Sequence, residues 1–227
     1  MKYTQLSKSL LSTLVAGGLI GSTMAGEMTS PLSLESAPPP PVDVLSSDSV
    51  FSDLGLSFAV AVGYDNEYIW RGSELGKDLT WFDVSASKGL TDDLSFTLGL
   101  WQASWRQGDE LDIYASLDYS LGPVSLSLGW IYYYFYGGGG DYNEYSLGAS
   151  TSLGPVDLGL TYYIAPESGF DYSYVEFSAE TSFGITDRLS LDIGAAVGYG
   201  DEDFISFQGG PSESSMTHVG VTAGMSF

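Results

Sequence analysis

SFAVAVGYDNEYIWRG, residues 57–72, alternates between two kinds of side chain. The odd positions are mainly small or charged, and the even positions are apolar or aromatic almost throughout: Phe58, Val60, Val62, Tyr64, Tyr68 and Trp70. Successive side chains of a β-strand point to opposite faces, so the alternation predicts a strand with one apolar face. The pattern begins at Leu54 and is longer than an ordinary strand of ~5 residues. It suits the ~10 residues with which a strand crosses a bilayer.

Nine further segments keep one apolar parity and are divided by turn signals: 79–88, 94–105, 111–120, 124–136, 143–153, 156–165, 172–185, 189–200 and 216–227. The connections after the even-numbered segments are tight, at 89–93, 121–123, 154–155 and 186–188. Those after the odd-numbered segments are mostly longer and more polar. Ten strands with short turns on one side and long loops on the other are typical of an outer-membrane barrel, whose short turns face the periplasm.

Aromatic residues gather on the long-loop side of this predicted barrel. Amphipathic rings at that level would form the interfacial girdle of a membrane barrel. The residues expected in the girdle are Tyr68, Trp70, Trp81, Trp130, Tyr132, Tyr134, Tyr162 and Tyr174.

The sequence therefore predicts an all-β fold, in which residues 54–227 form a ten-stranded antiparallel transmembrane β-barrel of the outer-membrane type. The alternative is a secreted β-sandwich or a lipocalin-like barrel, which also alternates. Its exposed parity should be rich in Lys, Glu and Thr, whereas here the non-apolar parity is mostly Gly, Ala and Ser. Small side chains inside and bulky ones outside favour lipid as the surroundings, and hence the outer membrane of a Gram-negative-type bacterium.

The first 53 residues differ from the predicted barrel. Residues 1–25 have two Lys, an apolar core from Leu10 to Ile20 and a final Ala, which together predict a cleaved export signal peptide. Residues 26–53 include SAPPPP and lack sustained periodicity, so we expect a Pro-rich periplasmic tether. At the other end, the terminal aromatic Phe227 resembles the sorting signal read by the barrel-assembly machinery, which is therefore an expected partner.

Three stretches resemble the TorF-type porin family: GYDNEYIWRG at 63–72, LDIYASLDYSLGPVSLSLGWIYYYFY at 111–136 and NEYSLGAS at 143–150. The resemblance covers roughly residues 55–227, through short motifs that are partly generic to barrels. It implies an outer-membrane β-barrel that acts as a pore, and it carries over no catalytic residue. The Pro-rich tether departs from the family pattern.

Composition excludes several functions. The chain has 29 acidic and 7 basic residues in 227, a net charge of -22, so nucleic acid would be repelled. It has no Cys and one His, which rules out disulfides, thiol catalysis and a Cys/His zinc site. We expect no enzyme activity, no metal and no cofactor. His218 has the inward parity and is expected to be a polar interior residue, and Asp201 to Asp203 to be a solvated acidic loop, with weak divalent-cation binding as the alternative.

The expected inward face is acidic, with Arg71 as the main opposing base. We expect Arg71 to bridge inward acids, an anion-binding place at the rim being the alternative. The acids expected to line the interior are Asp65, Glu67, Asp83, Asp112, Asp118, Glu144, Asp157, Glu176, Glu180 and Asp192. Charge of one sign in a pore decides which ion enters. The sequence thus predicts a narrow porin in outer-membrane lipid that passes small, preferentially cationic solutes, or alternatively a closed structural or surface-binding barrel without transport.

Overall fold

The computed structural model describes residues 55–227, apart from 138–139, 167–170, 187–188, 211–212 and 227. The expected signal peptide (1–25), the tether (26–53) and Phe227 lie outside the described residues. The elements are β1 (Leu56–Trp70), β2 (Ser73–Gly89), β3 (Leu94–Trp105), β4 (Gly108–Leu121), β5 (Val124–Tyr136), β6 (Tyr142–Leu153), β7 (Val156–Ala165), β8 (Tyr172–Thr186), β9 (Leu189–Gly200), α2 (Glu202–Phe207) and β10 (Ser215–Ser226). The prediction of ten strands is confirmed, with most bounds within two residues.

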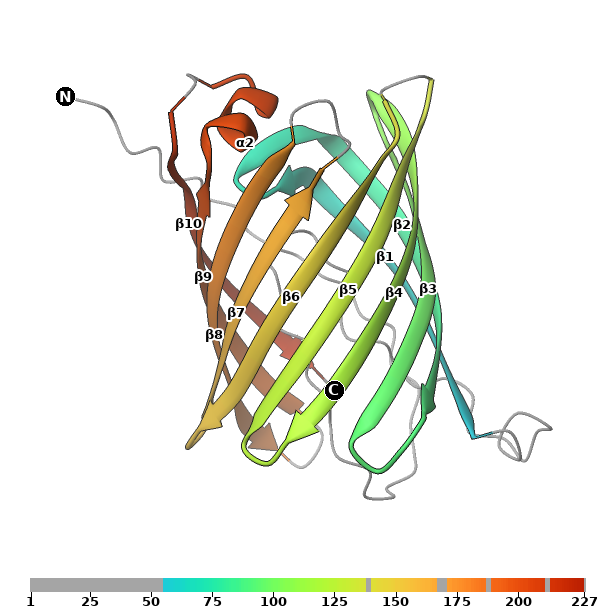
Figure 1. The fold of residues 1–227 in the computed structure, drawn as a ribbon, viewed down its shortest axis with the longest axis vertical. Helices are drawn as coiled ribbons and strands as arrows, with labels where there is room; N and C mark the ends of the chain where they lie inside the picture. Colours follow the sequence, from blue (N-terminus) through green and yellow to red (C-terminus); the bar gives the residue numbers. More distant parts are fainter. Residues whose placement is uncertain (1–54, 138–139, 167–170, 187–188, 211–212, 227) are drawn as a thin grey trace.

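The ten strands form a single sheet in which each strand pairs with its neighbour along the chain. All nine pairings are antiparallel. The strands are inclined and the sheet curls around a central space, with α2 at one end beside β9 and β10 (Figure 1). We call this end the α2 end and the opposite end the turn end.

The sheet curls into a half-barrel, so the expected closed barrel is present only in part. Among the described residues no ladder joins β1 to β10, which are the two edges of the sheet. The edges approach each other at the α2 end, where the Gln208 side-chain amide donates to the Arg71 carbonyl at 3.4 Å. A Cβ added to Gly72 would lie only 2.7 Å from the Cβ of His218.

The connections at the α2 end differ from the expectation in one respect. β1 joins β2 through Arg71 and Gly72 alone, and β3 joins β4 through Arg106 and Gln107 alone. Arg71 and Gly72 have φ values of 45° and 86°, as the tight primed turns of hairpins require. Residues 73–78 belong to β2. The sequence pattern assigned them to a loop, because the alternation of apolar and polar residues is interrupted there.

Apolar side chains cover the outward face of the sheet. Val62, Val219 and Val221 are 70 %, 67 % and 72 % exposed, and many Leu, Phe and Tyr side chains are exposed on the other strands. The buried residues lie inside the curl and mix aromatic with charged side chains. This distribution is the reverse of a water-soluble barrel, whose apolar face packs inward. Within the described part of the chain, no helix has the length and apolar character needed to span a membrane.

Candidate functional site: the interior of the sheet

A register irregularity decides which side chains of β1 reach the interior. Asp65 points inward, because its carboxylate accepts a hydrogen bond from the Trp81 indole at 2.9 Å. The ladder of β1 with β2 leaves out one pair, Asn66 with Asp78, and Asp78 has a φ of 59°. A one-residue slip moves every following side chain to the other face. Tyr68 and Trp70, 2 % and 4 % exposed, therefore lie inside.

This placement corrects the expected girdle. Tyr68 and Trp70 were assigned to lipid from a parity that the slip reverses. Trp81 shares the parity of the buried Asp83, and Tyr174 that of the buried Glu176, so both also face inward. The prediction was wrong for these four residues: the slip reverses the parity of Tyr68 and Trp70, and Trp81 and Tyr174 were chosen by their place at the strand ends. Trp130, Tyr132, Tyr134 and Tyr162 do have the outward parity, and Tyr134 and Tyr162 are exposed.

Arg71 and Glu144 form a salt bridge across the interior. Glu144 accepts two hydrogen bonds from the guanidinium, at 2.5 and 2.7 Å, and both side chains are 1 % exposed. Arg71 follows β1 and Glu144 lies on β6, five strands away in the sheet. The salt bridge therefore crosses the central space and does not join neighbouring strands of the sheet. Arg71 does bridge an inward acid, but its partner is on a distant strand and not among its sequence neighbours.

Aromatic rings surround this salt bridge. The guanidinium carbon lies 4.1 Å from the ring centre of Tyr163 and 4.7 Å from those of Trp70 and Tyr174. Such cation–π contacts stabilise a desolvated Arg by ~2 kcal/mol or more. The Tyr172 hydroxyl also donates to Glu144, at 2.7 Å.

Helix α2 completes the packing at this end. Its Phe204 is fully buried and lies 4.9 to 5.5 Å, between ring centres, from Trp70, Tyr172 and Tyr174. Its Phe207 contacts Tyr142 on β6 at 5.9 Å. Residues from β1, β6, β8 and α2 thus fill the interior at the α2 end. We call them the Arg71 cluster: Trp70, Arg71, Tyr142, Glu144, Tyr172, Tyr174, Phe204 and Phe207.

Further acids are buried in the same region. Asp83 accepts from the Tyr114 hydroxyl at 2.9 and 3.1 Å, and Asp112 is 5 % exposed. Glu110 accepts from the Tyr68 hydroxyl at 2.8 Å and is 1 % exposed. The sequence reasoning missed Glu110 because the strand was expected to begin at residue 111. Its parity, the same as that of Asp112, was the signal that would have found it.

The remaining predicted interior acids are less buried. Asp118, Asp157, Glu180 and Asp192 share the inward parity of their strands and are partly exposed toward the turn end. Asp157 and Glu180 are direct partners in the pairing of β7 with β8. Glu67 differs, since it lies at the slip and pairs with Lys77 at 3.7 Å, both side chains being substantially exposed. It is therefore a residue of the α2-end rim and not of the buried interior.

His218 and Asp201 have structural partners. The Nε2 of His218 lies 3.6 Å from Glu176, and its Nδ1 lies 3.0 Å from the Thr217 hydroxyl. Asp201 caps α2 by accepting from the Phe204 amide at 2.8 Å, and it also accepts from the amide and hydroxyl of Ser173. The acidic run is thus a helix start and not the expected loop. No group of three or more His, Cys, Asp or Glu side chains that could hold a metal ion occurs among the residues that the structure describes.

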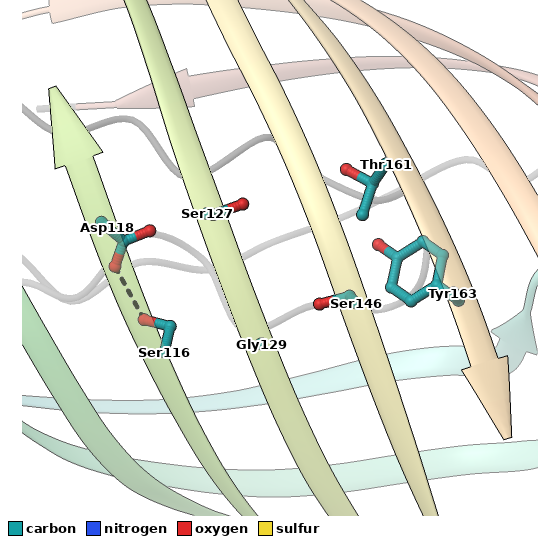
Figure 2. Close-up of a pocket in the computed structure, with 7 residues that line it drawn as sticks. All are labelled: Ser116, Asp118, Ser127, Gly129, Ser146, Thr161 and Tyr163. Carbon is teal, nitrogen blue, oxygen red and sulfur yellow. Dashed lines mark hydrogen bonds between the residues drawn. The ribbon is translucent and has the colours of Figure 1, made fainter. Parts of the chain in front are cut away.

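A cavity of about 150 Å³ lies on the inward side of β4 to β7. It is lined by Ser116, Asp118, Ser127, Gly129, Ser146, Thr161 and Tyr163, and Figure 2 shows these residues on four neighbouring strands. Ser116 donates to one carboxylate oxygen of Asp118 at 2.8 Å. The Arg71 guanidinium packs against the ring of Tyr163, so the cavity borders the Arg71 cluster.

Comparison with solved structures finds similarity to an anion-selective porin from Comamonas acidovorans, with 21 % sequence identity and a TM-score of 0.34. The match covers 74 % of this chain and 50 % of the porin chain, so this chain spans about half the length of the protein it matches. No family model matches the chain, and no curated protein does.

Proposed function

We propose that this chain is a porin-like β-barrel of the bacterial outer membrane that passes small cations. One observation carries the proposal: the sheet has an apolar outward face and a polar, acidic inward face. The apolar outward face is compatible with contact with lipid, and a water-filled bore requires a polar inward face. The resemblance to TorF-type porins remains a prediction. Lipid, the barrel-assembly machinery and small solutes are the partners that the proposal implies.

The charge of the interior supports a preference for cations. Among the described residues, the bases of inward parity are Arg71 and His218, and Arg71 is engaged by Glu144. For Asp118, Asp157 and Asp192 no ion pair with a base is found among the described residues. Walls of low dielectric constant weaken screening, so this excess of negative charge would concentrate cations. We therefore propose the opposite preference to the one stated in the name of the Comamonas porin.

A second candidate, a closed barrel without transport, is favoured by the Arg71 cluster. Its salt bridge and rings cross the interior at the α2 end. A solute would pass there only if the cluster moved. In the channel proposal the described arrangement is the closed state, and in the second candidate it is permanent.

Single-channel recording in a planar bilayer distinguishes the two. The channel proposal expects discrete currents and, under a KCl gradient, a reversal potential of the sign set by K⁺. The variant Asp157→Asn/Asp192→Asn should shift this potential toward zero, whereas Glu202→Gln on the exposed side of α2 should not. An anion-selective wild type would overturn the charge argument. Absence of current in every condition would favour the closed barrel.

The membrane location is tested separately by surface labelling. The wild-type chain has no Cys, so single Cys residues can be introduced at exposed positions. Cys in place of Asp141, in the α2-end connection of β5 and β6, should react with an impermeant maleimide on intact cells. Cys in place of Asp92, at the turn end, should react only after the outer membrane is opened. The reverse pattern would contradict the orientation.

A further inference from the structure

We infer that the cavity between β4 and β7 holds one monovalent metal cation, bound by Asp118 and the surrounding hydroxyl groups. The role of such a site in permeation rests on the proposed channel function. Binding itself does not, and it is measured below without transport.

The cavity offers only oxygen ligands. Its polar side chains are one carboxylate and five hydroxyl groups, from Ser116, Ser127, Ser146, Thr161 and Tyr163, with no nitrogen-bearing side chain in the lining. Carboxylate and neutral oxygen atoms are the ligands that hard cations take in proteins. In Figure 2 the Tyr163 hydroxyl points toward the middle of the group.

The Asp118 carboxylate lacks a compensating charge. One of its oxygen atoms accepts a hydrogen bond from Ser116, and no hydrogen bond or ion pair to the other is found among the described residues. The nearby Arg71, which packs against the Tyr163 ring, is paired with Glu144. A half-buried carboxylate without a counter-charge is unfavourable, and a bound cation would reduce that cost.

Two glycines shape the cavity wall. A Cβ added to Gly148 would lie 2.2 Å from the Ser127 hydroxyl oxygen, and one added to Gly129 would lie 2.2 Å from that of Ser146. Each hydroxyl therefore lies flat against a glycine of the neighbouring strand, which leaves the space in front of it open. At about 30 Å³ for each water, the cavity has room for a cation with a few waters.

The charge of the cavity selects the class of cation. Divalent sites are built from several carboxylates, whereas this cavity has one. No cluster of three His, Cys, Asp or Glu side chains, such as divalent sites use, occurs in the described part of the chain. A single negative charge among neutral oxygen atoms matches a single positive charge, so Na⁺ or K⁺ is the expected occupant.

The test is anomalous diffraction from crystals of the full chain grown with RbCl, since Rb⁺ replaces K⁺ and scatters anomalously. We expect a peak within the cavity, and we expect it to disappear in Asp118→Asn and persist in the control Asp192→Asn. No peak in the wild type, or a peak that survives Asp118→Asn, would overturn the inference. A peak without channel current would contradict the channel proposal and support the cation site. Channel current without a peak would support the channel and contradict the site.

A second measurement does not depend on Asp118 variants folding. The thermal unfolding midpoint of the wild type should be higher in KCl than in N-methylglucamine chloride at equal ionic strength, because a ligand of the native state stabilises it. The difference should shrink in Ser127→Ala and Thr161→Val. An unchanged difference in both variants would also overturn the inference.

Discussion

Glycines on the inward face allow aromatic rings of the neighbouring strand to pack directly against the backbone. A Cβ added to Gly63 would lie 2.2 Å from Trp81, one added to Gly99 would lie 2.1 Å from Tyr114, and one added to Gly198 would lie 2.0 Å from Tyr174. These contacts are far closer than any real Cβ tolerates. The glycines thus allow large rings to lie along the wall, from which they reach the interior acids.

The substitution Gly99→Ala should destabilise the fold by about 1 to 3 kcal/mol, because the new methyl group overpacks against Tyr114. Tyr114 would then have to leave its position, in which it donates to Asp83. The measurement is the urea midpoint of the refolded protein in lipid vesicles. Gly224→Ala is the control, since nothing lies within 4 Å of its added Cβ. Equal effects of the two substitutions would contradict the packing argument.

The Arg71 salt bridge supplies a second prediction at this scale. Glu144→Gln should destabilise the protein by about 3 to 5 kcal/mol, because it leaves a buried guanidinium without its counter-charge. The double variant Arg71→Met/Glu144→Leu should recover much of the loss, since it removes both charges. Thermal unfolding of the three proteins tests this. A double variant less stable than Glu144→Gln would show that the ion pair itself is strongly stabilising.

Helix α2 is the element that closes the interior at its end of the sheet. Only six residues long, it is held by the Asp201 cap and by burial of Phe204 and Ile205. Asp201 also joins α2 to β8 through Ser173. The position of α2 therefore depends on the Asp201 side chain as well as on the apolar contacts of the helix.

Asp201→Ala should loosen α2, at a cost of about 1 kcal/mol for the lost cap. Hydrogen exchange of the amides of residues 202–207 should become faster, while exchange in β4 and β5 stays unchanged. Asp203→Ala is the matched control, because Asp203 lies in the first turn but does not accept the Phe204 amide. In the channel proposal, Asp201→Ala also opens more often in bilayer recordings. Equal exchange in both variants would contradict the role of the cap.

At the scale of the whole molecule, the two edge strands β1 and β10 must pair if the sheet is to form a closed barrel. Unpaired strand edges carry amide and carbonyl groups that lipid cannot satisfy, so a membrane-spanning sheet must close. The edges already lie close at the α2 end, where a Cβ added to Gly72, after β1, would lie 2.7 Å from the Cβ of His218 on β10. In an antiparallel pair, opposed residues face the same side, so outward Val62 should face an outward residue of β10.

We expect a disulfide between Cys at position 62 and Cys at one of positions 219, 221 and 223 when the protein is refolded in lipid. Paired Cys residues of a closed barrel lie within the Cα separation that a disulfide needs, roughly 4.4 to 6.8 Å. Mobility on a non-reducing gel is the measurement, with Cys at 62 and 220 as the inward-parity control. Disulfide formation between chains in place of within them would indicate that the edges pair with a second copy.

Periodicity by itself determined the strands of this protein. A period of two residues and turn signals such as LGP and GP are local properties, so the ten strands, their neighbours and their apolar faces follow from the sequence. The tertiary structure alone decided what crosses the interior. The irregularity at Asn66 and Asp78 reverses a parity that no local pattern reveals, and the partner of Arg71 is 73 positions away. The capping sequence of α2 was legible in DEDFISF, but its docking depends on β1, β6 and β8, which only the curled sheet brings together.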